Sequence, residues 1–184
     1  TALDRGDYRK AFALLKPHPA AGRARLMARD RGRVLIALGG GAHVRRLGVS
    51  IAGAITRHCP DLRVDIARGF ALTGTAPGLP ARCRWVSAPD GLGDRLAAAQ
   101  AAVVAGGVTL YEACALGTPM GAVPVVPAQR RAIAAAAAAG AAMTVTPRGH
   151  RRIADEVAAS VAQLVRRPNL AAGLSRRARR LVDD

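Results

Sequence analysis

The chain has 184 residues, enough for one domain with a substantial core and too few for two full α/β domains. Its hydrophobic share of 51% and its ordinary glycine and proline content exclude disordered, collagen-like and low-complexity filament classes. The net charge of +16 rests on 28 basic residues, of which only Lys10 and Lys16 are lysines. Because the arginines are scattered along the chain, their number alone does not establish nucleic-acid binding.

The cysteines and the hydropathy pattern indicate a reducing, cytoplasmic setting. Cys59, Cys83 and Cys114 are odd in number, far apart and without a CxxC motif, which predicts neither a disulfide framework nor a zinc site. No apolar run reaches the roughly 18 residues of a membrane span. We expect no metal and no cofactor. The chain begins at Thr1 rather than methionine, and we expect it to be a fragment.

The first third of the chain changes from polar to strongly patterned. Residues 1–31 are charged around a short apolar stretch and are predicted to form an arm or an interdomain linker. The apolar run at residues 33–38 ends at three glycines, as expected for a buried parallel strand that enters a tight turn. Apolar residues then recur at helical spacing over residues 44–55, which predicts an amphipathic helix.

The same alternation continues to the end. Further strands are predicted at residues 62–67, 84–87, 101–105, 120–126 and 142–146, and further helices at 92–99, 108–116, 128–139, 153–164 and 170–181. Strands that alternate with helices predict a Rossmann-like α/β domain at residues 32–184, a three-layer sandwich whose six-stranded parallel sheet has helices on both faces. Ligands of such sheets bind at the carboxyl ends of the strands, here the loops at residues 39–43, 106–109 and 127–129.

The first of these loops is rich in glycine but lacks the GxGxxG dinucleotide fingerprint. Gly40 and Gly41 would let the main chain approach an anion at the start of the following helix. The alternative is that the glycines only form a tight turn. His43 could donate to a diphosphate oxygen or act as an acid, and we favour the alternative of a surface histidine.

The loop that ends the fourth predicted strand is the more informative. Gly106 and Gly107 place the amides of Val108 and Thr109 at a helix N-terminus, where hydrogen bonds and the helix dipole favour phosphate. Glu112 follows Thr109 by three residues on the same helix face, so its carboxylate could bind sugar hydroxyls beside the phosphate. The same spacing also fits a capping box between Thr109 and Glu112, and spacing alone leaves both interpretations open.

The stretch at residues 105–119, AGGVTLYEACALGTP, with Gln129 and an alanine helix that closes at Gly140, resembles the nucleotide-sugar-binding half of GT-B fold glycosyltransferases. It looks most like the UDP-sugar hydrolases of the pseudaminic acid pathway and the N-acetylglucosaminyltransferase that makes lipid II. The likeness covers nearly the whole chain but only the C-terminal half of such an enzyme. In these relatives the catalytic base belongs to an N-terminal domain, which this chain would lack.

The resemblance implies roles for individual positions. Glu112 would bind the ribose hydroxyls of UDP, the amides of Val108 and Thr109 the diphosphate, and Gln129 the donor sugar. Gly40 and Gly41 would line the cleft, and the base would lie against the loop at residues 86–89. The chain departs from the family pattern at Pro127-Ala128, where an acidic residue and an asparagine are usual, and at Gly41-Ala42, where serine or aspartate follows the first glycines.

These patterns predict the donor-binding domain of a UDP-sugar-dependent glycosyltransferase or hydrolase. One alternative is a non-catalytic nucleotide-binding or scaffold module. Another is an arginine-rich nucleic-acid binder, which we do not favour because the few aromatic residues offer no stacking platforms. The cluster of Arg176, Arg177, Arg179 and Arg180 predicts either a solvated helix face or a peripheral contact with anionic membrane.

Overall fold

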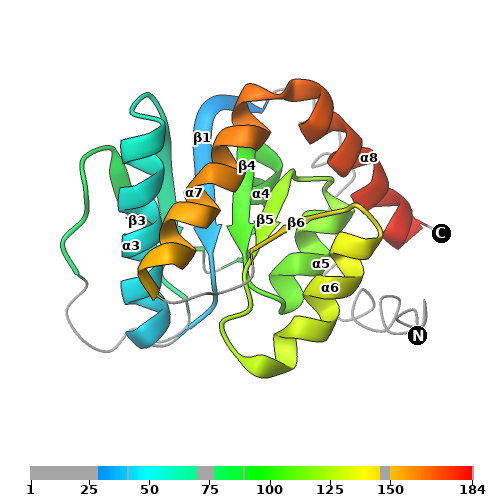
Figure 1. Cartoon of the computed structure of the whole chain (residues 1–184), viewed down its shortest axis with the longest axis horizontal. Coiled ribbons are helices and arrows are strands. Elements are labelled where there is room, and N and C mark those ends of the chain that lie inside the picture. The colour runs from blue at the N-terminus through cyan, green and yellow to red at the C-terminus, as the bar shows by residue number, and fades with distance from the viewer. Residues whose placement is uncertain (1–28, 41, 70–76, 89, 146–149, 184) are drawn as a thin grey trace.

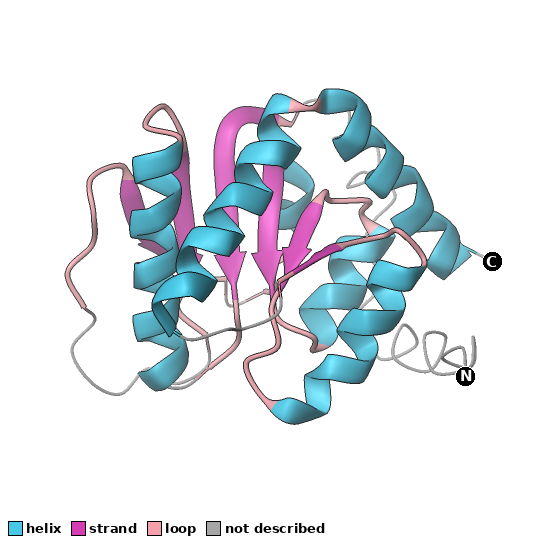
Figure 2. Cartoon of the chain, viewed as in Figure 1, coloured by secondary structure: helices cyan, strands magenta, loops and turns pink. Residues whose placement is uncertain are grey.

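A computed structural model describes residues 29–40, 42–69, 77–88, 90–145 and 150–183 of the chain. In these residues six strands form one sheet in the order β3-β2-β1-β4-β5-β6, and every pairing is parallel. The strands are β1 (Asp30–Ala37), β2 (Arg63–Ala67), β3 (Cys83–Val86), β4 (Ala99–Val104), β5 (Met120–Ala122) and β6 (Met143–Thr144). Figure 2 shows the strands side by side in magenta with their arrowheads pointing the same way. The predicted parallel sheet is confirmed.

Helices cover both faces of the sheet, which confirms the predicted three-layer sandwich (Figure 1). The helices are α3 (Ala42–His58), α4 (Gly93–Ala98), α5 (Val108–Ala115), α6 (Arg130–Ala138), α7 (His150–Arg166) and α8 (Pro168–Asp183), and the 3-10 turn η2 (Pro127–Gln129) precedes α6. One layer contains α3 and α7, and the other contains α4, α5 and α6.

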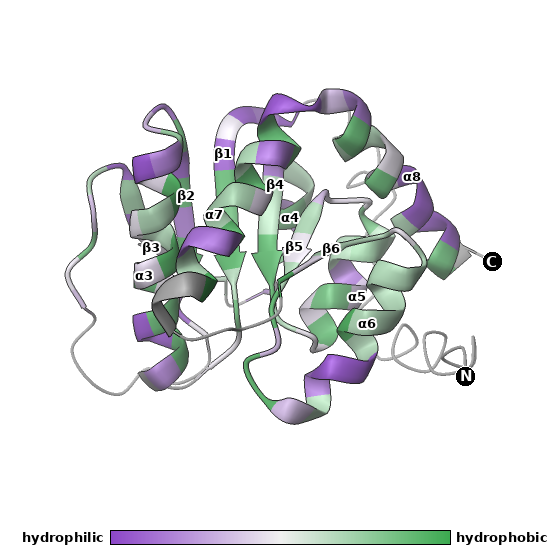
Figure 3. Cartoon of the chain, in the orientation of Figure 1, coloured by the Kyte–Doolittle hydropathy of each residue, from purple (hydrophilic) through white to green (hydrophobic). Residues whose placement is uncertain are grey.

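Successive side chains of β1 pack against the two helix layers in turn. Val34 and Ile36 face the cluster of α3 and α7, whereas Leu35 and Ala37 face the cluster of α4, α5 and α6. A strand buried on both faces must be apolar throughout, and Figure 3 shows the ends of β1 and β4 in the green of hydrophobic residues. The core is almost purely aliphatic, as the scarcity of aromatic residues predicts.

The C-terminal helix α8 connects the two layers. Its Leu174 packs with Leu164 of α7 and Ala101 of β4, and one turn further Ala178 joins the cluster that contains α5. This position brings Arg177 and Arg179 of α8 against Gly140 and Gly117, which follow α6 and α5.

The prediction of strand five is wrong in its extent, because β5 ends at Ala122 rather than at residue 126. The amide of Val123 still donates to the carbonyl of Val104, at 2.9 Å, but Pro124 has no amide proton for the next ladder bond. The helix predicted from residue 128 starts as the 3-10 turn η2 and becomes α-helical at Arg130. The predicted arm at residues 1–31 lies outside the described residues up to residue 28, and β1 begins at Asp30.

Candidate functional site

Three loops meet the carboxyl edge of the sheet after β1, β4 and β5. After β1, Leu38 is buried and Gly39 and Gly40 are exposed. Gly41, a predicted cleft residue, lies outside the described residues. A small pocket opens beside this turn, lined by Leu38, Gly39 and Val44 with neighbouring side chains of β1, β2 and α3.

The turn after β1 is shaped by the turn after β2. Gly69 has a φ of +70°, and a Cβ on it would stand 2.5 Å from the carbonyl oxygen of Gly39 and 2.8 Å from the Cα of Gly40. Only glycine allows the two turns to approach this closely. His43, in the first turn of α3, is exposed, which agrees with the surface interpretation that the sequence favours.

The loop after β4 leads into a helix whose N-cap residue supplies no side-chain cap. Gly107 is the N-cap residue of α5 and has an extended backbone with φ −102° and ψ −157°. Val108 and Thr109 are therefore the first two helical residues, and their amides have no partner within the helix. Because a capping box requires the threonine at the N-cap, the position of Thr109 excludes the capping box that the sequence left open.

The two glycines of this loop have different neighbours. A Cβ on Gly106 would stand 2.8 Å from the Cβ and the carbonyl oxygen of Gln129 and 2.9 Å from a side-chain carbon of Ile133. A Cβ on Gly107 would meet no atom of the described residues within 4 Å. Packing against the start of α6 therefore explains Gly106, whereas the space in front of Gly107 is open to a ligand.

Glu112 lies one turn along α5 from these amides. Glu112 and Thr109 are both half-buried, while Leu110 and Ala113 of the same helix are fully buried toward the sheet. Residues three apart share a helix face, so Thr109 and Glu112 lie on the side of α5 that is turned away from the core. Val108 is 55% exposed at the edge of the site.

Gln129 is positioned by its own loop. Its Oε1 accepts a hydrogen bond from the Val125 amide at 2.9 Å, which closes the turn between β5 and η2. The side-chain nitrogen carries two protons that it can donate. The contact with Gly106 places Gln129 directly beside the loop at residues 106–109.

Basic residues at the start of α6 add positive charge to the same edge. Arg130 and Arg131 are both exposed in the first helical turn, and no acidic residue accompanies them there. Figure 3 shows this turn in purple. Cations are unfavourable at a helix N-terminus, so their position is better suited to attracting an anion than to stabilising α6.

The loop after β3 is tied back onto α4. The amide of Gly91 donates to the carbonyl of Ala88 at 3.1 Å, and Nη2 of Arg95 donates to the carbonyl of Ser87 at 3.2 Å. Pro89 lies outside the described residues. The resemblance assigns this loop to the base of the nucleotide.

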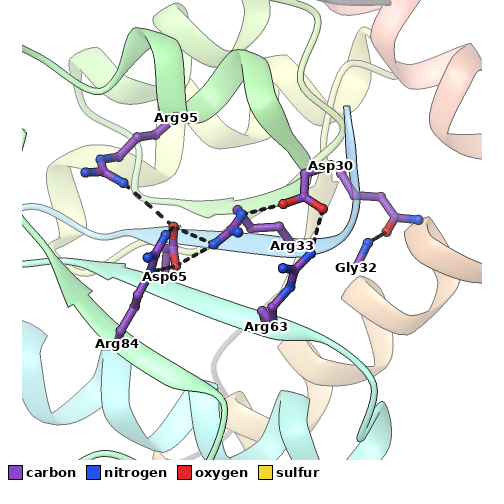
Figure 4. Close-up of polar contacts among 8 residues, drawn as sticks. Asp30, Gly32, Arg33, Arg63, Asp65, Arg84 and Arg95 are labelled. Atoms are coloured by element: carbon purple, nitrogen blue, oxygen red, sulfur yellow. Dashed lines mark hydrogen bonds and ion pairs between the residues drawn. The ribbon is translucent and has the colours of Figure 1, made fainter. Parts of the chain in front are cut away.

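A buried aspartate lies behind this loop, and sequence reasoning missed it. Asp65 on β2 is 3% exposed and accepts hydrogen bonds from Arg84 at 2.7 and 3.1 Å and from Arg33 at 3.2 and 3.3 Å. Nη1 of Arg95 lies 3.8 Å from its Oδ2. Figure 4 shows the three arginines converging on this carboxylate from three different elements.

The arginines outweigh the burial of this carboxylate. Burial by itself raises the pKa of Asp65, but the hydrogen bond from Arg84 and the charges of Arg33, Arg84 and Arg95 hold that pKa below its ordinary 3.8. The signal in the sequence is the alternation of Arg63 and Asp65 with buried Val64 and Ile66, which makes one face of β2 polar.

Arg29 binds the C-terminal end of α5, at the other end of the helix from Val108 and Thr109. Arg29 donates to the carbonyls of Ala99 at 2.9 Å and Gly117 at 2.7 Å. Gly117, with a φ of +59°, follows the end of α5 in the way typical of a helix C-terminus. Burial, and then the charge of Arg179, lower the pKa of Arg29 to about 10.

The four arginines of the terminal cluster differ in their contacts. Arg177 donates from Nε to the carbonyl of Gly140 at 2.8 Å, and the side chain of Arg179 packs on Gly117. Arg176, Arg177 and Arg180 are exposed.

The described residues include all three cysteines and other side chains of the types that bind metals. All three cysteines are free, and burial raises the pKa of Cys114 in α5 to about 12, so its thiol stays protonated at neutral pH. No group of three or more His, Cys, Asp or Glu side chains in this part of the chain is placed to hold a metal ion. None of its helices is both long enough and apolar enough to cross a membrane.

Comparison with solved structures identifies the fold. The spinosyn rhamnosyltransferase SpnG, solved with thymidine diphosphate, matches 92% of the chain with a TM-score of 0.64 at 24% identity. The calicheamicin glycosyltransferase CalG4 matches 83% with a TM-score of 0.67 at 21% identity, and the glycosyltransferase VinC, solved with dTDP, matches 92% with a TM-score of 0.62 at 21% identity. The chain has the fold of one half of a GT-B glycosyltransferase.

This GT-B half spans 44%, 38% and 41% of the lengths of SpnG, CalG4 and VinC. No protein-family model matches it, and neither does any curated protein by sequence. The fold predicted from the resemblance is confirmed. In the GT-B half the loops after β1, β4 and β5 all open at one edge of the sheet, where an open α/β sheet binds its ligands.

Proposed function

We propose that the chain is the donor-binding domain of a glycosyltransferase and binds the nucleoside diphosphate part of a nucleotide sugar at the N-terminus of α5. One observation carries the proposal. At the N-terminus of α5, Gly107 brings no side-chain cap to the amides of Val108 and Thr109, and no atom of the described residues fills the space before Gly107; Glu112 lies one helical turn away. This geometry suits a diphosphate at the helix end and a pentose beside the carboxylate.

The reaction that fits this arrangement is displacement at the anomeric carbon of the donor sugar. The amides of α5 and its dipole would stabilise the charge that develops on the departing diphosphate. The side-chain nitrogen of Gln129 would donate to the sugar. As the resemblance implies, the base or the acceptor would come from an N-terminal domain, which makes this GT-B half an electrostatic and positioning component of the whole enzyme.

We propose UDP as the nucleotide, because a carboxylate that binds both ribose hydroxyls distinguishes UDP from dTDP. SpnG and VinC were solved with thymidine diphosphate and dTDP, which agrees with a site for pyrimidine nucleoside diphosphates. The absence of a 2′-hydroxyl in dTDP removes one hydrogen bond to a charged group, which is worth about 1.5–3 kcal/mol.

Calorimetric titration of UDP, UMP, dTDP and ADP into the wild type and Glu112→Ala tests the proposal. The wild type is expected to bind UDP more tightly than UMP, dTDP or ADP. Glu112→Ala should lower the affinity for UDP at least tenfold, and it should also reduce the ratio of the UDP affinity to the dTDP affinity. Asp155→Ala is a matched control, since Asp155 is an exposed acid on α7, in the other helix layer. Equal affinity for uracil and adenine nucleotides, or unchanged UDP binding to Glu112→Ala, contradicts the proposal.

We also propose a weak peripheral contact with anionic membrane, carried by Arg176 and Arg180. The two side chains are exposed and four residues apart on one face of α8. Basic residues near an anionic surface contribute about 1 kcal/mol each. The double variant Arg176→Gln/Arg180→Gln should lose sedimentation with phosphatidylserine-containing vesicles. Equal sedimentation of wild type and variant, or equal sedimentation with neutral vesicles, contradicts this contact.

A further inference from the structure

Two arginines from distant parts of the chain meet at Gly117, which follows the C-terminal end of α5. Nη2 of Arg29 donates to the carbonyl of Gly117 at 2.7 Å. A Cβ on Gly117 would stand 2.6 Å from Nη1 of Arg179 and 3.0 Å from Cζ of the same guanidinium. Because Gly117 has no side chain, the guanidinium of Arg179 lies against the same backbone to which Arg29 is bonded.

The two guanidiniums carry like charges in a partly buried place. Both arginines are half-buried, and the pKa of Arg29, which burial and then the charge of Arg179 lower to about 10, still leaves Arg29 charged at neutral pH. Among the residues that the structure describes, no aspartate or glutamate forms an ion pair with either of them. Like charges repel more strongly where water is partly excluded, so the pair destabilises the folded chain unless an anion is bound.

The hydrogen-bond donors of the pair are only partly used. Arg29 donates three hydrogen bonds, to the carbonyls of Ala99, Leu116 and Gly117, and a guanidinium has five protons to donate. Arg179 forms no hydrogen bond within the described part of the chain, although it is half-buried. A partly buried guanidinium without an acceptor is unfavourable, and a bound anion would supply the missing acceptors.

We propose that Arg29 and Arg179 together bind a phosphate group at the C-terminal end of α5. Guanidinium groups match the geometry of phosphate oxygens through parallel N–H bonds. A phosphate group carries up to two negative charges at neutral pH, which balances the two guanidiniums, whereas a carboxylate carries only one.

The position at a helix C-terminus by itself explains only one of the two arginines. Cations are favourable there, because the last carbonyls of a helix have no partner within it. Arg29 already donates to the carbonyls of Leu116 and Gly117. Arg179 adds no such bond, so without an anion its charge only repels Arg29.

The inference goes beyond the proposed function, because it concerns the other end of α5. The helix has eight residues, so at about 1.5 Å per residue its two ends lie about 12 Å apart. Phosphate bound at the amides of Val108 and Thr109 would not touch Arg179. The two sites can therefore be tested separately.

The test is urea unfolding of the full chain at neutral pH, in chloride and in inorganic phosphate at equal ionic strength. Wild type is compared with Arg179→Gln and with the matched control Arg176→Gln, an exposed position of the same helix with the same change of charge. In chloride, Arg179→Gln should unfold at the urea midpoint of the wild type or above it, because the repulsion of Arg29 is removed. Phosphate should raise the midpoints of wild type and Arg176→Gln equally, and most of this shift should be lost in Arg179→Gln. Acetate should raise the wild-type midpoint less than phosphate does.

Three results would overturn the site. One is an unchanged phosphate shift in Arg179→Gln, which would leave Arg179 with a packing role. Another is an equal loss of the shift in Arg176→Gln, which would indicate only general charge. The third is an acetate shift as large as the phosphate shift. Failure of nucleotide binding to the wild type would overturn the proposed function and leave this inference standing.

Discussion

Gly106 and Gln129 are in direct contact, so closely that a Cβ on Gly106 would stand 2.8 Å from the carbonyl oxygen of Gln129. The contact joins the loop after β4 to the start of α6, and it fixes the distance between the amides of α5 and the side chain of Gln129. A Cβ built on the adjoining Gly107 would have no neighbour within 4 Å among the residues that the structure describes. Gly106 therefore allows close packing against Gln129, whereas Gly107 leaves space for a ligand.

Alanine substitutions separate these purposes. Gly106→Ala should lower the free energy of unfolding by about 1–3 kcal/mol, because the added methyl group overlaps the backbone of Gln129. Gly107→Ala should cost less than about 1 kcal/mol, since alanine adopts extended backbone angles and is only a poorer N-cap. Urea unfolding measures both.

Gly107→Ala should weaken nucleotide binding although it lowers the stability less than Gly106→Ala does. Gly107→Ala places a methyl group where the diphosphate would lie, so UDP affinity measured by calorimetry should fall at least tenfold in a folded protein. A Gly107→Ala variant that binds UDP as the wild type does would show that the diphosphate lies elsewhere.

Arg29 should contribute strongly to stability although it lies at the beginning of the described chain. Arg29→Gln removes charge-assisted hydrogen bonds to the carbonyls of Ala99 and Gly117, and we expect a loss of about 2 kcal/mol in urea unfolding. Arg31→Gln is a matched control, since Arg31 is exposed, and should stay within about 0.5 kcal/mol of the wild type. Equal stabilities of the two variants would refute the role of Arg29.

The Asp65 cluster makes the free energy of unfolding depend on pH in the acid range. The pKa of Asp65 is lower in the folded protein than its ordinary 3.8, so the unfolded chain takes up a proton first as the pH falls. The contribution of Asp65 is therefore complete above about pH 4 and is lost as the pH falls through the lower folded value. Below pH 4, the slope of unfolding free energy against pH should be smaller in Asp65→Asn than in the wild type.

Asp65→Asn should also be less stable at neutral pH, by about 3 kcal/mol, because Arg33 and Arg84 lose their shared anion. Identical acid profiles for the two proteins would show that another carboxylate carries the transition.

The sheet could be predicted because its two middle strands, β1 and β4, contain apolar runs that end at glycine, after Leu38 and Ala105. The extent of β5 could not be predicted as easily, because Val125 and Val126 continue the apolar pattern after Pro124 has ended the ladder. Local composition favours a strand there, whereas the missing amide proton forbids it.

Part of the candidate site could be predicted from the sequence and part could not. Gly106, Gly107 and Glu112 are close in sequence, so spacing along one helix was enough to bring them together. The cluster around Asp65 requires the register of β1, β2 and β3, which spacing does not give. Arg177 and Arg179 look like surface charge in sequence, and only the docking of α8 shows that the exposed Arg177 bonds to the carbonyl of Gly140 and that Arg179 packs on Gly117.

The most direct measurement of the central claim is a titration of UDP followed by the backbone amide signals of Val108 and Thr109 in a nitrogen–proton NMR spectrum. If the N-terminus of α5 holds the diphosphate, these two signals should shift the furthest at saturation, and they should barely move with uridine, which has no phosphate. The claim is contradicted if both signals stay in place while UDP saturates the protein and shifts amides of another helix N-terminus.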